Sequence, residues 1–137
     1  MPRWLFMTLL LLQAHFAASY LVPLDEGAQR EFGGLLRWAW PWSIGDGGPL
    51  GRMTATGFPL AGFFIAVTAA TMLFLAALAL LRWWIPFDWW RALAMAGAAL
   101  SLVLMVLFFG PTKLLPMATA LAILAAALGY WPVATGE

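Results

Sequence analysis

The chain has 137 residues, of which 64% are hydrophobic and 9% are charged, with seven Lys/Arg against six Asp/Glu. Soluble domains carry roughly 25% charged residues, so this composition excludes an ordinary soluble domain and predicts a single membrane domain over residues 1–137. The net charge of +1 comes without a basic cluster, which argues against nucleic acid as a partner. The absence of cysteine excludes disulfides, thiolate metal sites and dithiol redox chemistry.

The first apolar run follows Arg3 and predicts a membrane helix at about residues 4–22. The same run also fits a secretory signal peptide, whose apolar core usually spans ~7–15 residues. Here the apolar stretch continues to Val22, and the best small-residue cleavage pattern, with Ala17 and Ser19, is poor. We therefore favour a retained helix over a cleaved signal.

Three further runs, almost free of charge, predict helices at about residues 55–82, 89–110 and 113–131. A helix rises about 1.5 Å per residue, so runs of this length can cross a hydrocarbon core of about 30 Å. The connections RWWIPFDWWR and GPTK are short, which predicts that successive helices are antiparallel neighbours. The sequence thus predicts an all-α integral membrane protein, a four-transmembrane-helix bundle. Asp88, in the first of these connections, is expected to cap the third helix.

The long first loop, residues 23–54, contains charged residues and a stretch rich in glycine and proline. Its segment EFGGLLRWAWPW places Phe32, Leu35, Leu36 and three tryptophans among few charges, which predicts a short segment lying in the plane of the membrane interface. The alternative is a platform for a substrate or partner. Tryptophans gather at membrane interfaces, and seven are predicted to be interfacial anchors: Trp38, Trp40, Trp42, Trp83, Trp84, Trp89 and Trp90.

The distribution of basic residues bears on orientation. With four spans, three arginines share one side and four basic residues share the other: Arg3, Arg82 and Arg91 against Arg30, Arg37, Arg52 and Lys113. Because Arg3 directly precedes the first span and the first loop has more acids than bases, we expect a multi-pass protein of the cell membrane with both termini cytoplasmic.

The predicted spans offer little intramembrane chemistry, since they hold no acidic residue and His15 is their candidate ionisable group. Thr8, His15 and Ser19 fall on one polar stripe of the first helix, which we expect to face other helices or a cavity, whereas Gln13 and Tyr20 share a roughly opposite face. A neutral His15 that makes one interhelical hydrogen bond is the favoured interpretation. The alternatives make His15 a cofactor-binding residue for haem, a pigment or a quinone.

Catalytic motifs are missing: the sequence has no two-histidine zinc spacing, no phosphate-binding loop and no GxSxG elbow, so no enzyme, catalytic residue, metal site or resident cofactor is predicted. The acids Asp25, Glu26 and Glu31 are best explained by helix capping or ion pairing. Small side chains recur at helical spacing in the third and fourth runs and predict close helix packing at Ala94, Gly97, Ala98, Ser101, Ala118, Ala122 and Ala126.

The layout of four spans with a long first loop resembles the small four-helix membrane proteins that include the DoxX-like group. This resemblance lies in topology, and it transfers no activity or site residue. The sequence favours a structural or accessory protein that packs in membrane lipid with itself or with a larger membrane complex. The alternatives are a small transporter or channel, which would need the Thr8/His15/Ser19 stripe to line an aqueous path, and a redox accessory subunit that uses His15.

Overall fold

A computed structural model of the chain describes residues 1–22, 27, 30, 38–42 and 59–129, with the backbone alone at 59 and 60. The elements in this part of the chain are all helical, as predicted. The four long helices are α1 (Arg3–Ala18), α5 (Pro59–Leu80), α6 (Trp90–Leu107) and α7 (Leu114–Ala127). Three single 3₁₀ turns adjoin them: η1 (Ser19–Leu21), η2 (Phe87–Trp89) and η3 (Pro111–Lys113).

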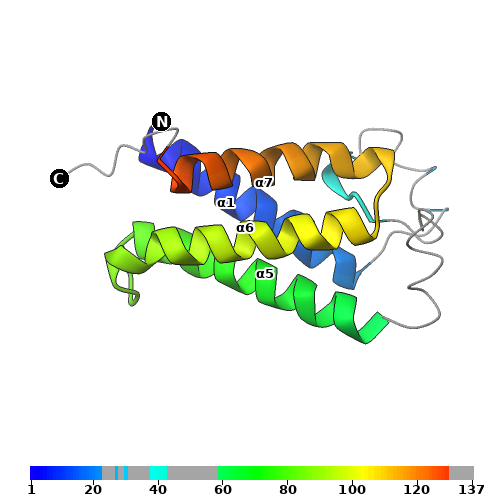
Figure 1. The fold of residues 1–137 in the computed structure, drawn as a ribbon, viewed down its shortest axis with the longest axis horizontal. Coiled ribbons are helices and arrows are strands. Elements are labelled where there is room, and N and C mark those ends of the chain that lie inside the picture. The colour runs from blue at the N-terminus through cyan, green and yellow to red at the C-terminus, as the bar shows by residue number, and fades with distance from the viewer. Residues whose placement is uncertain (23–26, 28–29, 31–37, 43–58, 130–137) are drawn as a thin grey trace.

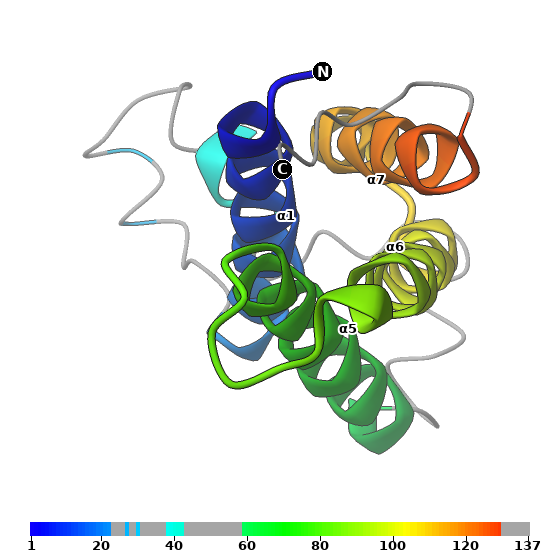
Figure 2. The same cartoon turned by 90° about the vertical axis from the view of Figure 1, so that its left-hand side faces the viewer.

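The four helix axes are roughly aligned, and successive helices run in opposite directions (Figure 1). The chain start and the α5–α6 turn lie at one end of the bundle, and the α6–α7 turn lies at the other. Seen along the bundle, α5 lies between α1 and α6, and α7 packs on α6 (Figure 2). Helix α1 also contacts α6 and α7, which closes the bundle.

Three segments are long and apolar enough to cross a membrane: Arg3–Leu21, Ala61–Leu80 and Phe87–Leu107. The fourth apolar segment, Pro111–Ala127, is shorter. Its helix stops because Gly129 adopts a φ of +91° and donates its N–H to the carbonyl of Ala126. A left-handed glycine just beyond the last turn is a common helix terminator, because glycine adopts positive φ without a steric penalty. Helix α7 therefore ends four residues before the predicted bound of 131.

Helix α5 ends in the same geometry without glycine. The N–H of Trp83 bonds to the carbonyl of Leu78, and the N–H of Arg82 bonds to that of Ala79. This pair of bonds is the Schellman arrangement, whose left-handed position is usually glycine. Arg82 occupies that position with a φ of 57°, and its guanidinium carbon lies 5.2 Å from the centre of the Phe87 ring. The turn between α5 and α6 thus holds an arginine where the backbone favours glycine.

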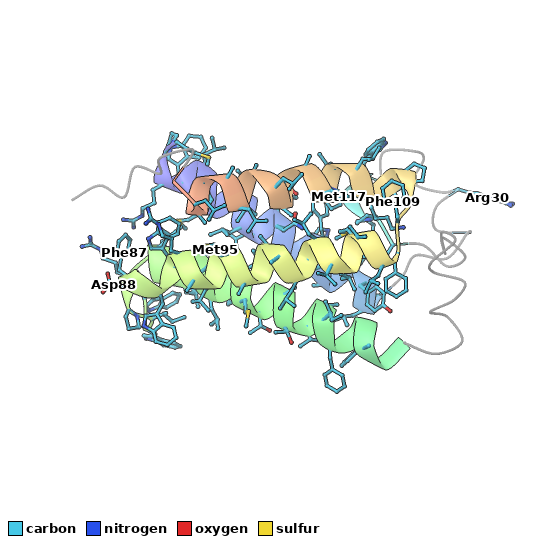
Figure 3. All side chains as sticks on the ribbon, viewed as in Figure 1. Arg30, Phe87, Asp88, Met95, Phe109 and Met117 are labelled. Atoms are coloured by element: carbon cyan, nitrogen blue, oxygen red, sulfur yellow. The ribbon has the colours of Figure 1, made fainter. Side chains whose placement is uncertain are left out.

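Asp88 does not cap α6, so that prediction is wrong. It lies inside η2, and neither η2 nor α6 begins with a side-chain capping bond. The backbone supplies the turn instead, because the N–H of Trp89 bonds to the carbonyl of Pro86. Figure 3 shows Asp88 beside Phe87 at the end of the bundle opposite Phe109.

The interior divides into two apolar clusters along the bundle. The larger lies toward the chain start and includes Phe6, Leu10, Leu73, Trp90 and Ile123. The smaller lies toward the α6–α7 turn and consists of Phe16, Trp42, Ala66, Leu104 and Met105. Helices α5 and α6 approach closely at Gly97. A Cβ there would lie 3.1 Å from the Leu73 nitrogen and 3.2 Å from the Ala69 oxygen, so only glycine fits without a shift.

Candidate functional site

A hydrogen-bonded polar centre joins three helices in the middle of the bundle. Nε2 of Gln13 on α1 donates to Oγ of Ser101 on α6 over 2.5 Å, and the Thr119 hydroxyl on α7 bonds to Oε1 of the same carboxamide. Gln13 and Ser101 are completely buried, and Thr119 is nearly so. The Thr119 hydroxyl also lies 2.9 Å from the Pro116 carbonyl, and its single proton serves one acceptor at a time. We call Gln13, Ser101 and Thr119 the polar centre.

The polar centre lies between the two apolar clusters. Along α6, Ala98 belongs to the larger cluster and Leu104 to the smaller, with Ser101 between them. Along α1, Leu10 and Phe16 flank Gln13 in the same way. A carboxamide has both donors and an acceptor, so it can satisfy hydroxyl groups from two other helices at once. No buried side-chain nitrogen or oxygen in the described part of the chain lacks a hydrogen-bond partner.

Sequence reasoning did not single out Gln13, because it assigned the inward role to the stripe on the other face of the helix. In the structure, most of the Thr8/His15/Ser19 stripe faces out of the bundle. Thr8 and His15 are exposed, and only Ser19 is buried. The Thr8 and Ser19 hydroxyls bond to carbonyls of their own helix, at Trp4 and Phe16. The available signal was the carboxamide itself, whose burial demands more partners than a hydroxyl does.

His15 faces outward beside the segment 38–42. Its Nε2 lies 2.9 Å from the carbonyl oxygen of Ala39, and its ring meets the Trp40 ring edge to face at 5.1 Å. A carbonyl oxygen can only accept, so Nε2 carries the proton of a neutral ring and Nδ1 is left as an acceptor. His15 therefore holds the first loop to α1 rather than another helix.

The segment 38–42 is fastened to the bundle by side-chain bonds to backbone carbonyls. Besides the His15 bond, the Trp40 indole donates to the carbonyl of Val22, and the Trp42 indole donates to that of Phe16. The Thr112 hydroxyl donates to the carbonyl of Pro41. The carbonyls near the end of α1 are open to such donors because the helix narrows there into η1. Residues Phe32, Leu35 and Leu36 of the predicted interfacial segment lie outside the described residues, as do Asp25, Glu26 and Glu31.

Trp42 is buried, although the sequence assigned it to the membrane interface. Its ring packs edge to face on Tyr20 and Phe108, and Nζ of Lys113 lies 5.0 Å from the ring centre. Lys113 is itself completely buried in η3. Aromatic rings attract cations through the negative charge of their faces, and this attraction strengthens away from water. This cluster was not predictable from local sequence patterns, because Trp42 and Lys113 are 71 residues apart.

The other predicted anchors divide between surface and interior. Trp90 is buried and meets Phe6 edge to face at 5.6 Å. Trp40 is partly buried. The remaining four are exposed: Trp38, Trp83, Trp84 and Trp89. Trp83, Trp84 and Trp89 lie at the α5–α6 end of the bundle, where an interfacial role remains a prediction.

The predicted packing residues are also split. On α6, Ala94, Gly97, Ala98 and Ser101 are all buried. On α7, Ala126 is buried, Ala122 is partly buried and Ala118 is exposed. The sequence stripe on α7 is therefore turned so that its first member points out of the bundle.

The described residues contain no group of three His, Cys, Asp or Glu side chains that could hold a metal ion. Comparison with protein-family models, with curated proteins and with solved structures finds no match for the chain.

Proposed function

We propose that this chain is a multi-pass membrane protein of structural or accessory type, which acts by packing against another membrane protein chain. The observation that carries this proposal is the polar centre. Gln13, Ser101 and Thr119 hydrogen-bond to one another and join α1, α6 and α7. Buried polar groups used in this way hold helices together in lipid, where such bonds contribute ~0.6–2 kcal/mol each. The polar interactions of the described interior thus hold this chain's own helices together, which supports the structural type.

The proposal includes a fourth membrane crossing by α7. Helix α7 has 14 residues and η3 adds one 3₁₀ turn, which together rise about 27 Å. This length falls slightly short of a hydrocarbon core of about 30 Å, and a bilayer adapts to such a mismatch by local thinning. Four crossings place both chain ends on one side. Because Arg3 directly precedes the first span and the first loop has more acids than bases, we propose the cytoplasmic side of the cell membrane.

The outer face of α7 is the surface that we propose for the partner. Four exposed residues recur at spacings of four, three and seven, which places them on one side of α7 and of the residue that follows it: Leu114, Ala118, Leu121 and Leu128. Leu115 is exposed beside them. Helix α7 packs extensively on α6 and less on α1, and its exposed face points away from both. Ala118 lies in the middle of this face and lets another backbone approach closely.

The test places a photo-crosslinking residue at Leu121 of the full chain in its native membrane. The matched control carries the same residue at Val103, which is exposed on α6. The proposal expects a protein crosslink from position 121, either to a second copy or to one defined larger chain, and a weaker one from position 103. Crosslinks to lipid alone from both positions, with a monomer in mild detergent, would contradict it.

A further inference from the structure

An open groove runs between α1 and α5 on the outside of the bundle. Its volume is about 390 Å³, within the usual range for small-molecule sites. Three alanines hollow it out, and Leu11 and Phe74 give it apolar walls; its lining is Leu11, Ala14, His15, Ala18, Ala70, Thr71 and Phe74. The polar groups in this lining are the imidazole of His15 and the hydroxyl of Thr71.

The hydrogen bond to Ala39 fixes what the imidazole can offer a ligand. The Nε2–H group donates its hydrogen bond to the Ala39 carbonyl oxygen. In a neutral ring, Nδ1 is then the only nitrogen that can accept a hydrogen bond. Nε2 is thereby engaged and cannot ligate a metal without breaking this bond. The lone pair of Nδ1 is the part of the ring that a ligand can use.

The position of the groove, near the middle of two membrane-spanning segments, makes a hydrogen bond to the ligand more favourable. His15 and Thr71 each lie within about 5 Å of the midpoint of their apolar segments, Arg3–Leu21 and Ala61–Leu80. Both side chains are exposed. At this depth in a bilayer the open side of the groove faces hydrocarbon, which offers no hydrogen bond to an exposed nitrogen acceptor. A ligand that brings its own donor restores the missing bond.

We propose that this groove binds an apolar molecule that carries a hydroxyl group, which donates a hydrogen bond to Nδ1 of His15. The three alanines admit the apolar body of the ligand, and Phe74 packs against it. Two sources share this chemistry, the phenolic ring of a hydroquinone and the aliphatic alcohol of a lipid. The inference is independent of the proposed partner on α7, because the groove lies on the other side of the bundle, between α1 and α5.

The experiment uses the full chain, labelled with ¹⁵N-histidine, in lipid nanodiscs. The chain has one histidine, so the two imidazole nitrogens give an unambiguous pair of signals. The proposal expects protonated Nε2 and unprotonated Nδ1. Addition of duroquinol should shift the Nδ1 signal with saturation, whereas duroquinone, which has the same ring but no donor, should not. Dodecanol and dodecane form the matching aliphatic pair and identify the second source.

Two variants test whether the response belongs to the groove. Ala70→Leu fills the hollow and leaves the imidazole in place, and it should weaken duroquinol or dodecanol binding about tenfold. Ala99→Leu adds the same bulk at an exposed position on α6 and should bind as the parent does. The proposal is wrong if Nδ1 is protonated in the unliganded chain, or if Ala70→Leu binds as the parent does. It is also wrong if none of the four compounds shifts the Nδ1 signal. The same holds if neither donor compound differs from its partner, that is, if duroquinol shifts the signal as duroquinone does and dodecanol as dodecane does.

Discussion

Nε2 of Gln13 lies 2.5 Å from Oγ of Ser101, at a point where the interior of the bundle changes from one apolar cluster to the other. The two residues are 88 positions apart in the sequence. Oε1 of the same carboxamide also accepts a hydrogen bond from the Thr119 hydroxyl. One side chain therefore fixes how α1, α6 and α7 are aligned along their axes. Helices with a purely apolar interface could slide past one another at little cost. The hydrogen bonds of Gln13 form at only one alignment of the three helices.

Replacement of Gln13 by leucine should lower the free energy of unfolding by about 1–2 kcal/mol. The variant keeps the volume but leaves the Ser101 hydroxyl buried without its donor. Unfolding in mixed micelles, followed by circular dichroism, measures the change. Thr8→Val is the matched control on α1, because the Thr8 hydroxyl is exposed and bonds only within its own helix. Equal stability of Gln13→Leu and the parent would contradict a structural role for the polar centre.

Gly97→Leu should lower the free energy of unfolding by about 1–3 kcal/mol, because new side-chain bulk must displace the backbone of α5 at Ala69 and Leu73. Ala99→Leu lies two residues along the same helix at an exposed position and should change stability little. The same micelle unfolding assay compares the two. If both variants are as stable as the parent, α5 and α6 do not approach at Gly97 as described.

Trp42→Ala should lower the free energy of unfolding by about 3–5 kcal/mol, since it removes a buried ring and its bond to the Phe16 carbonyl. Trp84→Ala should stay within about 0.5 kcal/mol, because Trp84 is 90% exposed. Thermal melts of both variants in the same detergent make the comparison. A Trp84 variant less stable than the Trp42 variant would reverse our assignment of which tryptophan is buried.

Arg82→Gly should be more stable than Arg82→Ala by about 1 kcal/mol. Both variants lose the contact of the guanidinium with Phe87, but only glycine adopts the positive φ of this position without a steric penalty. Comparison of the two variants therefore isolates the backbone term from the side-chain term. Equal melting temperatures would show that the left-handed turn is not formed at Arg82.

Membrane topology can be read from single cysteines, since the chain has none of its own. In intact cells, a membrane-impermeant maleimide should label Pro111→Cys and spare both Asp88→Cys and Glu137→Cys. Permeabilised cells supply the control, because all three should then react. Labelling of Glu137→Cys together with Pro111→Cys, while Asp88→Cys is spared, would mean that α7 does not cross the membrane. Labelling of the other two positions alone would reverse the orientation and leave the four crossings intact.

The helices were largely predictable because hydropathy acts locally. A run of apolar residues long enough to cross a bilayer must satisfy its own backbone hydrogen bonds, and a helix does so within the run. The expected all-helical fold is confirmed for the described residues, and three of the four predicted spans are long and apolar enough to cross a membrane. The ends were harder to predict. The fourth helix stops at a single left-handed glycine, and a 3₁₀ turn takes the place of the expected Asp88 cap.

The candidate sites depended on how each helix is rotated about its axis, and periodicity alone does not determine that rotation. Helix α1 has polar residues on two faces, and the face with Gln13 turned inward because Ser101 and Thr119 stand opposite it. His15 then turned outward to meet Ala39 and line the groove.

The sequence by itself determined that the chain is helical, that its helices are apolar enough for a membrane and that cysteine chemistry is absent. Only the tertiary structure decided which polar side chains are buried, and which tryptophans belong to the core. The physical reason is that composition and length act within one segment, whereas the burial of Gln13 and Trp42 depends on donors and acceptors 26 to 106 residues away along the chain.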